Sequence, residues 1–472
     1  MSKEMSKEDK NCNMFEIVNS FRGKGKFNFV YSQTITIDLS FTIIQYSNAK
    51  IEIHCFPIDN SQQTLLQLMQ LLNDFQNEEI IVNMLGMVNE STYGEIKVKE
   101  AYITTLKLDF KNGNLWIKLV LRSFLPVEIV FNKLKLDKDI KICAGLTNFV
   151  FGNCSSDDNS FSGFQADIEG YSINFNKIPD YAQCVKALED NNNPKTILLT
   201  SEAVVNYTTG VSVNFDDIFK NLSELLSYAS RTRISHIYEN YYSGEELFKV
   251  ILKPVLTSKY HKNNNLIDSH HHNQCTLKSY LESCYTPYSQ FVNQFGLNIV
   301  ISFYLESINS TYMDMGFLLN TTALETLLSG YVLLRDEESN PITQSIIKRN
   351  KKTIKKIFKD EGLDLDDVAD KIAIEISYSN LSVPEKLNAF IKDRRFTLKL
   401  DKYDRDFTTI RNSIAHTGKF PKEIKSSGKL RQINSKTECD RLIYLTDRII
   451  LTILNYKGNL FHNILNGSQE IL

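Results

Sequence analysis

Three residues near the end of one predicted helix have types and spacing suited to proton transfer beside a phosphate. Arg411, Asn412 and His416 lie in the segment TTIRNSIAHTG. Histidine exchanges protons near neutral pH, and arginine is a permanent planar cation that binds phosphate oxygens through paired hydrogen bonds. Asn412 and His416 are four residues apart and share a helix face, over which the long Arg411 side chain extends. The alternative is a helix-end salt bridge or cap.

The same segment predicts where its helix ends. Ile410 and Ile414 are also four residues apart, which gives the helix an apolar stripe for packing. Gly418 is a typical left-handed residue at a helix C-terminus. His416 then lies in the last turn, at the negative end of the helix dipole, where positive charge is favoured.

A second segment, RTRISH, repeats the spacing with Arg231 and His236. It lacks an asparagine partner and lies just after the expected junction of two domains. We therefore expect His236 to be a junction or surface histidine without a chemical role.

The elements that position these residues belong to the second half of an α+β chain. Apolar and polar residues alternate through many short runs in the first half, and Asn112-Gly113 separates two of them as a hairpin turn would. Helical spacing begins near residue 216 and includes the segment 244–256. The predicted fold is a β-rich N-terminal domain, sandwich- or barrel-like, followed by an all-α helical bundle. The expected parts are a disordered N-terminus (1–13), a β-rich sensing or regulatory domain (14–215), a helical connector (216–290) and the helical domain (291–465).

Composition sets limits on the class of protein. A length of 472 residues suggests two or three domains, and a net charge of −2 argues against a uniformly basic nucleic-acid binder while allowing a local basic patch. We expect no secretory signal and no membrane span, because the first residues are polar and no long uncharged apolar run follows. Eight scattered cysteines without a C-x-x-C pair favour reduced thiols in a cytoplasmic protein.

RNSIAHTG resembles the signature of the HEPN superfamily, α-helical domains in which an R-x4–6-H motif marks metal-independent ribonucleases. Ala323-Leu324-Glu325, on a predicted apolar helix, is similar to the early helix of that fold. A β-rich domain before such a bundle resembles the ApeA-like HEPN proteins of antiphage defence. The resemblance is specific only around 323–325 and 411–418.

The resemblance implies an endoribonuclease that cleaves cellular RNA, with tRNA favoured, to stop translation and abort infection. The RNA supplies its own 2′-hydroxyl nucleophile, His416 would act as acid and base, and Arg411 would stabilise the charged transition state. Asn412 would orient His416 or donate to the phosphate. Two chains would form a composite site, so a homodimer through the helical domain, or a higher assembly of dimers, is expected, with an unknown phage trigger. No cofactor, metal or membrane is implied.

Glu325 is a charged residue on an otherwise apolar helix, and a buried carboxylate needs a partner. Two interpretations stay open: a member of the site paired with Arg411, or a structural ion pair elsewhere.

Lysines near the motif and on one upstream helix are candidates for RNA-backbone contact. The predicted RNA-binding residues are Lys348, Lys352, Lys355, Lys356, Lys359, Lys419 and Lys422. Lys425, Lys429 and Arg431 follow in an expected flexible loop. The alternative for each is a solvated charged surface. DSHHHNQC (268–275) with Cys284 could suggest zinc, but consecutive histidines are poor joint ligands, so we expect a polar loop.

Two alternatives to the enzyme remain. One is a non-catalytic HEPN module for RNA binding or dimerisation in a defence or toxin–antitoxin complex. The other is a chain that a nucleotidyl-transfer enzyme modifies. The intact Arg411, Asn412 and His416 favour the ribonuclease.

Overall fold

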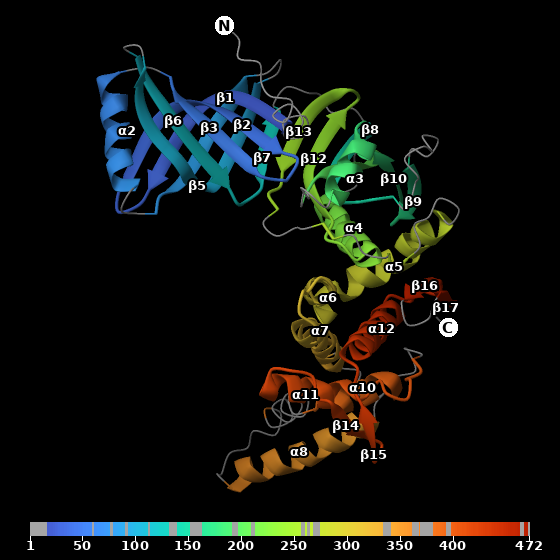
Figure 1. Ribbon diagram of the computed structural model, residues 1–472. Coiled ribbons are helices and arrows are strands. Elements are labelled where there is room, and N and C mark those ends of the chain that lie inside the picture. Colours follow the sequence, from blue (N-terminus) through green and yellow to red (C-terminus); the bar gives the residue numbers. More distant parts are fainter. Residues whose placement is uncertain are drawn as a thin grey trace. The chain divides into compact units, whose positions relative to one another are not determined.

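The computed structural model has strands in its first half and mostly helices in its second, as the predicted α+β class requires (Figure 1). It describes residues 17–470 except for the segments 59–60, 76–78, 90–92, 112–113, 132–138, 152–162, 191–196, 209–212, 256–259, 262–264, 268–273, 334–340, 361–367, 369–380, 393–397 and 463–466. The chain divides into two compact units. The first holds residues up to Ser227 and Thr232–Asn263, and the second holds Tyr228–Arg231 and nearly all residues from Asn264 onward. The expected disordered segment 1–13 lies outside the described residues.

Six antiparallel strands of the first unit hydrogen-bond in a closed ring. The strands are β1 (Ile17–Val30), β2 (Thr34–Tyr46), β3 (Ile51–Pro57), β4 (Ile81–Asn89), β5 (Tyr93–Lys111) and β6 (Asn114–Ser123). Their order is β4-β1-β2-β3-β6-β5, and β5 pairs back with β4. Lys111 pairs with Asn114, so the runs that flank Asn112-Gly113 form the predicted hairpin. Helix α2 (Gln62–Phe75) buries Leu68 and Leu71 in the same core.

A large aromatic ring inside this closed sheet requires glycine on the strands beside it. Phe41 of β2 is buried, and atoms of its ring would lie only 2.7 Å from a Cβ on Gly23 and 2.9 Å from a Cβ on Gly86. A Cβ on Gly23 would also lie 2.1 Å from the carbonyl oxygen of Met87. Any larger residue at Gly23 would therefore push β1 away from β4.

The sheet continues beyond the ring because β7 pairs with both β5 and β13. The further strands, in sheet order, are β7 (Val127–Phe131), β13 (Glu246–Leu252), β12 (Ser235–Ser243), β8 (Asp139–Thr147), β11 (Leu199–Thr208), β10 (Tyr171–Lys177) and β9 (Gly163–Ile168). Two helices accompany them, α3 (Tyr181–Glu189) and α4 (Phe215–Ser230).

The prediction of a helix over 244–256 is wrong, and the segment 216–290, predicted as a helical connector, contains the strands β12 and β13 as well as helices. Residues 246–252 form β13, which pairs with β12 and β7. Val250 and Leu252 are fully buried in the core of the closed ring. Gly244 has a φ of 60°, which suits the two-residue turn between β12 and β13. The apolar residues of LFKVIL fit both the helical period of 3.6 residues and the strand period of two. Pairing with the neighbouring strands decides that the segment is a strand.

The second unit is built around one helix that is apolar on most sides. Its helices are α5 (Gln274–Phe295), α6 (Leu297–Ile308), α7 (Met313–Leu333), α8 (Pro341–Asp360), α10 (Val383–Lys392), α11 (Phe407–Thr417) and α12 (Ser435–Ile453). Helix α7 contacts α5, α6, α10, α11 and α12. Within the described part of the chain, no helix is long and apolar enough to cross a membrane.

The expectation of an all-α second half is wrong in detail. It contains two short hairpins, β14 (Glu423–Ser426) with β15 (Lys429–Gln432), and β16 (Asn459–His462) with β17 (Gly467–Glu470). The first replaces the predicted flexible loop after the motif.

Candidate functional site

The helix that carries Arg411, Asn412 and His416 ends where the sequence predicts. Ile410 and Ile414 are buried and hold one face of α11 in the unit's core. Gly418 adopts the left-handed conformation, with φ 73° and ψ 8°, and its N–H donates to the carbonyl oxygen of Ile414. His416 therefore lies in the last turn.

Arg411 pairs with Glu325, as one of the two interpretations of Glu325 requires. Arg411 Nη2 lies 3.2 Å from Glu325 Oε2, and Arg411 Nη1 donates to Asn412 Oδ1 over 3.0 Å. Ala323 and Leu324 are fully buried in α7, whereas the Glu325 side chain is 26% exposed. The carboxylate thus lies at the surface edge of α7, where α11 passes it.

The two contacts hold the guanidinium without using all its donors. Arginine has five N–H groups. The hydrogen bonds described for Arg411 go to Glu325 and Asn412, which leaves the remaining donors for a phosphate. The Arg411 side chain is 39% exposed, so a ligand from solvent can reach it.

His416 is exposed on the surface of α11. The structure describes no hydrogen bond or ion pair of its ring. The amide oxygen of Asn412 accepts from Arg411, so the expectation that Asn412 orients His416 is not met here. The amide nitrogen of Asn412 can still donate to a phosphate.

The residues after the helix attach the end of α11 to α7. The Phe420 N–H donates to Asp314 Oδ1 over 3.0 Å, and the rings of Phe317 and Phe420 lie 5.2 Å apart. Lys419 and Lys422 are exposed on either side of this anchor. The connection restricts where the last turn of α11 can move.

The basic residues beyond Lys422 lie on the hairpin β14–β15, where Arg431 is bound by other residues of the protein. Arg431 donates to both carboxylate oxygens of Glu438, at 2.7 and 2.9 Å, and pairs with Asp406. Its guanidinium also lies over the Tyr403 ring. Arg431 is therefore a structural residue rather than a phosphate ligand, and the loop predicted here is wrong.

The predicted basic helix exists as α8. Lys348, Lys352, Lys356 and Lys359 are exposed, and Lys355 is half-buried. Ile357 is 53% exposed on the same helix, so its apolar face is not fully covered within the described residues.

The two halves of RTRISH have separate roles. Arg231 is buried and belongs to the second unit, where it donates to Asp447 over 2.7 Å and to Tyr304 over 3.1 Å. His236 belongs to the first unit, and its side chain is only 9% exposed. Of the two predicted locations, a junction or the surface, the surface is therefore wrong, whereas His236 does lie close in sequence to the unit boundary at Arg231–Thr232.

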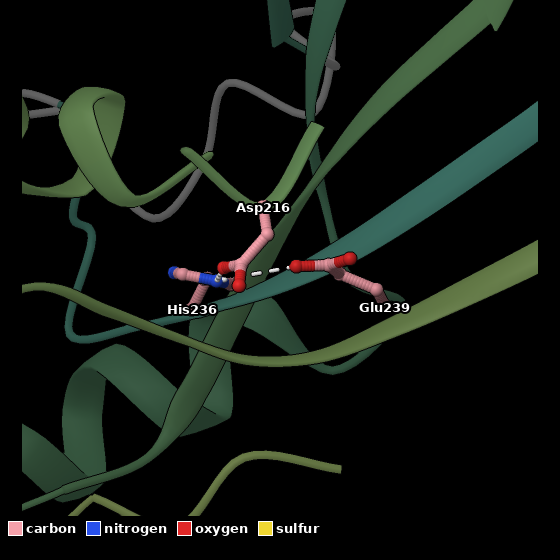
Figure 2. A group of neighbouring side chains, drawn as sticks. All are labelled: Asp216, His236 and Glu239. Atoms are coloured by element: carbon pink, nitrogen blue, oxygen red, sulfur yellow. Dashed lines mark ion pairs between the residues drawn. The ribbon is translucent and has the colours of Figure 1, made fainter. Parts of the chain in front are cut away.

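His236 belongs to a cluster that the sequence analysis missed. Figure 2 shows Asp216, His236 and Glu239 converging from α4 and β12. His236 Nε2 lies 3.4 Å from Asp216 and 3.3 Å from Glu239. A register shift between His236 and Tyr238 adds a residue to β12, so positions three apart reach the same side of the strand. Strict alternation would have separated them, and no simple sequence signal shows the shift.

Lys253 supplies the positive charge of this cluster. Its ammonium donates to Asp216 over 2.5 Å, contacts His236 at 2.5 Å, and donates to the fully buried Glu239. The hydrogen bond to His236, together with Lys253, holds the pKa of Asp216 well below its usual range. Burial raises the pKa of Glu239, but His236 and Lys253 outweigh it and the net shift is downward.

The His236 cluster contains side chains of the types that bind metal ions. One imidazole and two carboxylates within 4.8 Å of one another are suitable ligands. However, the Lys253 ammonium contacts all three, and a divalent ion would have to displace it. The residues fit an internal ion cluster that joins α4 to the two strands. The segment DSHHHNQC lies largely outside the described residues, and Cys284 is buried in α5.

Comparison of the chain with protein-family models, with curated proteins and with solved structures gave no match.

Proposed function

We propose that this protein is a metal-independent endoribonuclease of the HEPN type that acts in antiphage defence. The observation that carries the proposal is an exposed His416 in the last turn of α11, five residues after an Arg411 that Glu325 and Asn412 hold in place. Phosphodiester cleavage needs a group that exchanges protons and a cation that binds the phosphate oxygens, and His416 and Arg411 are groups of these two types.

In the proposed reaction the 2′-oxygen of one ribose attacks the adjacent phosphorus of the RNA backbone. The 2′-hydroxyl proton passes to one His416, and the 5′-oxygen leaves with a proton from a second His416. Arg411 holds the non-bridging oxygens as their charge grows. The products carry a 2′,3′-cyclic phosphate and a 5′-hydroxyl, so atoms and charges balance without a metal. Because one helix has one such histidine, two chains would complete the site.

The proposed substrate is cellular RNA, with tRNA favoured, and its cleavage would stop translation in an infected cell. The exposed lysines of α8, with Lys419 and Lys422, are proposed to hold the RNA backbone. The ring-forming first unit is proposed to sense infection or to restrain the nuclease.

The test is incubation of purified protein with total bacterial RNA in EDTA, followed by mapping of the cut ends. We expect His416→Ala to lower cleavage at least about 100-fold, in the range of lost acid–base catalysis. His54→Ala, which removes a half-buried histidine from the first unit, is the control and should cut normally. Equal cutting by His416→Ala and the native protein would refute the proposal. If the native protein is inactive, the assay is repeated in a phage-infected lysate.

A second candidate is a non-catalytic module for RNA binding or dimerisation. It is favoured by the observation that no described contact orients the His416 ring. It predicts RNA binding that depends on Arg411 but no cleavage in either assay.

A further inference from the structure

A cavity in the second unit has the features of a built ligand site. It measures about 180 Å³ and lies between the start of α7, the residues before it, and the first turns of α12. Its walls include Tyr312, Phe317, Asn320, Lys436 and Asp440. A cavity of similar size lined by apolar side chains can hold a benzene ring, so there is room for a small planar ring.

Asn320 lies in the wall of this cavity with an unused hydrogen-bond donor. The residue is only 1% exposed, its Oδ1 accepts from Thr446, and its Nδ2 has no hydrogen-bond partner. An unpaired buried amide costs free energy, so a buried polar group without a partner needs an explanation. A ligand with an acceptor atom would satisfy it.

The other polar groups of the cavity suit the edge and substituents of a heterocycle. Asp440 is half-buried, and burial raises its pKa while Lys436 lowers it. Its carboxylate can accept from a ring N–H or amino group, and Lys436 is exposed and can bind a phosphate. Tyr312 is 75% exposed at the rim, where an aromatic ring can stack on a base.

The cavity is connected to the end of α11. Phe317 lines it and packs on Phe420, whose N–H is held by Asp314 at the start of α7. Phe420 follows His416 by four residues, which the chain spans in at most about 14 Å. One strand of nucleic acid can therefore place a base in the cavity and a phosphate near His416.

We propose that this cavity binds one unstacked nucleobase of the RNA, with Tyr312 stacking on the base and Asn320 and Asp440 reading its edge. The inference rests on the proposed function. It adds a specificity site to it: the base held here selects which phosphate lies beside His416.

The test measures binding of fluorescent single-stranded oligo(A), oligo(C) and oligo(U) to the His416→Ala protein, in which cleavage does not interfere. We expect one homopolymer to bind most tightly, and Tyr312→Ala to weaken it about tenfold, the effect of one lost stacking contact. Asn320→Leu should reduce the preference among the homopolymers. In that variant the single hydroxyl proton of Thr446 can go to the Leu442 carbonyl, so Thr446 is not left without an acceptor. Met315→Ala is the matched control, because Met315 is 52% exposed on the first turn of α7 but does not line the cavity.

Competition with AMP, CMP, GMP and UMP separates RNA from a free nucleotide. If a mononucleotide binds as tightly as the oligonucleotides and Tyr312→Ala weakens both equally, the cavity is a free-nucleotide site and the RNA proposal is overturned. Unchanged binding in both Tyr312→Ala and Asn320→Leu would overturn it as well.

A parallel cleavage assay keeps the two proposals distinguishable. The same two changes are made in a protein that retains His416. Normal cleavage with an unchanged base preference rejects the cavity while the ribonuclease stands. Base-dependent binding without cleavage by the native protein, both alone and in phage-infected lysate, rejects the ribonuclease while the cavity stands.

Discussion

At the scale of single residues, the Arg411–Glu325 pair connects the two helices of the candidate site. Both side chains are partly exposed, so the pair contributes at most about 1 kcal/mol to stability. Its expected role is to hold the guanidinium in one orientation. Glu325→Ala should therefore lower kcat for RNA cleavage about tenfold while leaving the thermal stability nearly unchanged, because a misplaced group loses transition-state stabilisation.

Glu325→Gln separates position from charge. The amide retains an acceptor for Arg411 but no longer repels phosphate, so kcat should be largely kept and KM should fall. Kinetics of both variants on one defined RNA check this. A loss of kcat in Glu325→Gln as large as in Glu325→Ala would show that the charge, not the orientation, matters.

Cys439 lies in the wall of the cavity, where its surroundings disfavour the thiolate form. Burial, with Asp440 and Asp314, raises the pKa of Cys439 to about 12. Because the thiolate is the reactive form, iodoacetamide at pH 8 should modify Cys439 far more slowly in the folded protein than after denaturation. Peptide mass spectrometry measures this, and equal rates in the two states would contradict it.

At the scale of elements, the end of α11 depends on Gly418. A Cβ there would meet no atom within 4 Å, so the cost of a substitution comes from φ 73° alone. Gly418→Ala should lower the free energy of unfolding by about 1 kcal/mol. It should also displace His416, so that the loss of cleavage rate, expressed as a free energy, exceeds the loss of stability. Gly418→Asn is the matched control, because asparagine tolerates the left-handed conformation. Chemical denaturation and cleavage rates are measured on both variants. A loss of cleavage in Gly418→Ala no larger than in Gly418→Asn would contradict the expectation.

The cluster around Lys253 ties α4 to β12 and should make the first unit pH-sensitive. The folded pKa values of Asp216 and Glu239 are lowered, whereas the unfolded values are about 3.9 and 4.3. The stabilisation is therefore complete above the unfolded values and is lost as pH falls through the folded ones. Lys253→Met should cost about 3 kcal/mol near neutral pH, because it removes the ammonium that pairs with the buried carboxylate of Glu239.

Unfolding measured between pH 7 and pH 3 checks this. The native protein should lose more stability over that range than Lys253→Met. Lys249→Met, which removes a partly exposed lysine paired with Glu128, should change little. A native profile no steeper than that of Lys253→Met would contradict the assignment.

At the scale of the whole molecule, the chain divides into two compact units. Calorimetry should therefore resolve two unfolding transitions. Ile53→Ala removes a fully buried side chain from the closed ring, and Leu327→Ala removes one from α7. Each should cost about 2–5 kcal/mol and lower only one transition. A single transition that both variants lower equally would show that the units unfold together.

Part of this fold could be predicted from sequence because the signal was local. Helix α11, its stop at Gly418 and the hairpin at Asn112-Gly113 follow from apolar spacing, a cap residue and a turn dipeptide. Helix α2 was missed although QQTLLQLMQLLNDF has helical spacing. The hairpin around Ser427-Gly428 was missed because its strands are only four residues long.

By itself, the sequence determined the order of a β-rich and a helical half, the end of α11, and the presence of Arg411, Asn412 and His416 together on that helix. These depend on contacts between residues close together in the chain. Only the tertiary structure decided that 246–252 is a strand, that a register shift brings His236 to Glu239, and that Glu325 rather than another acid meets Arg411. Those outcomes depend on partners far away in sequence, and no local pattern states which partner a strand edge or a charge will find.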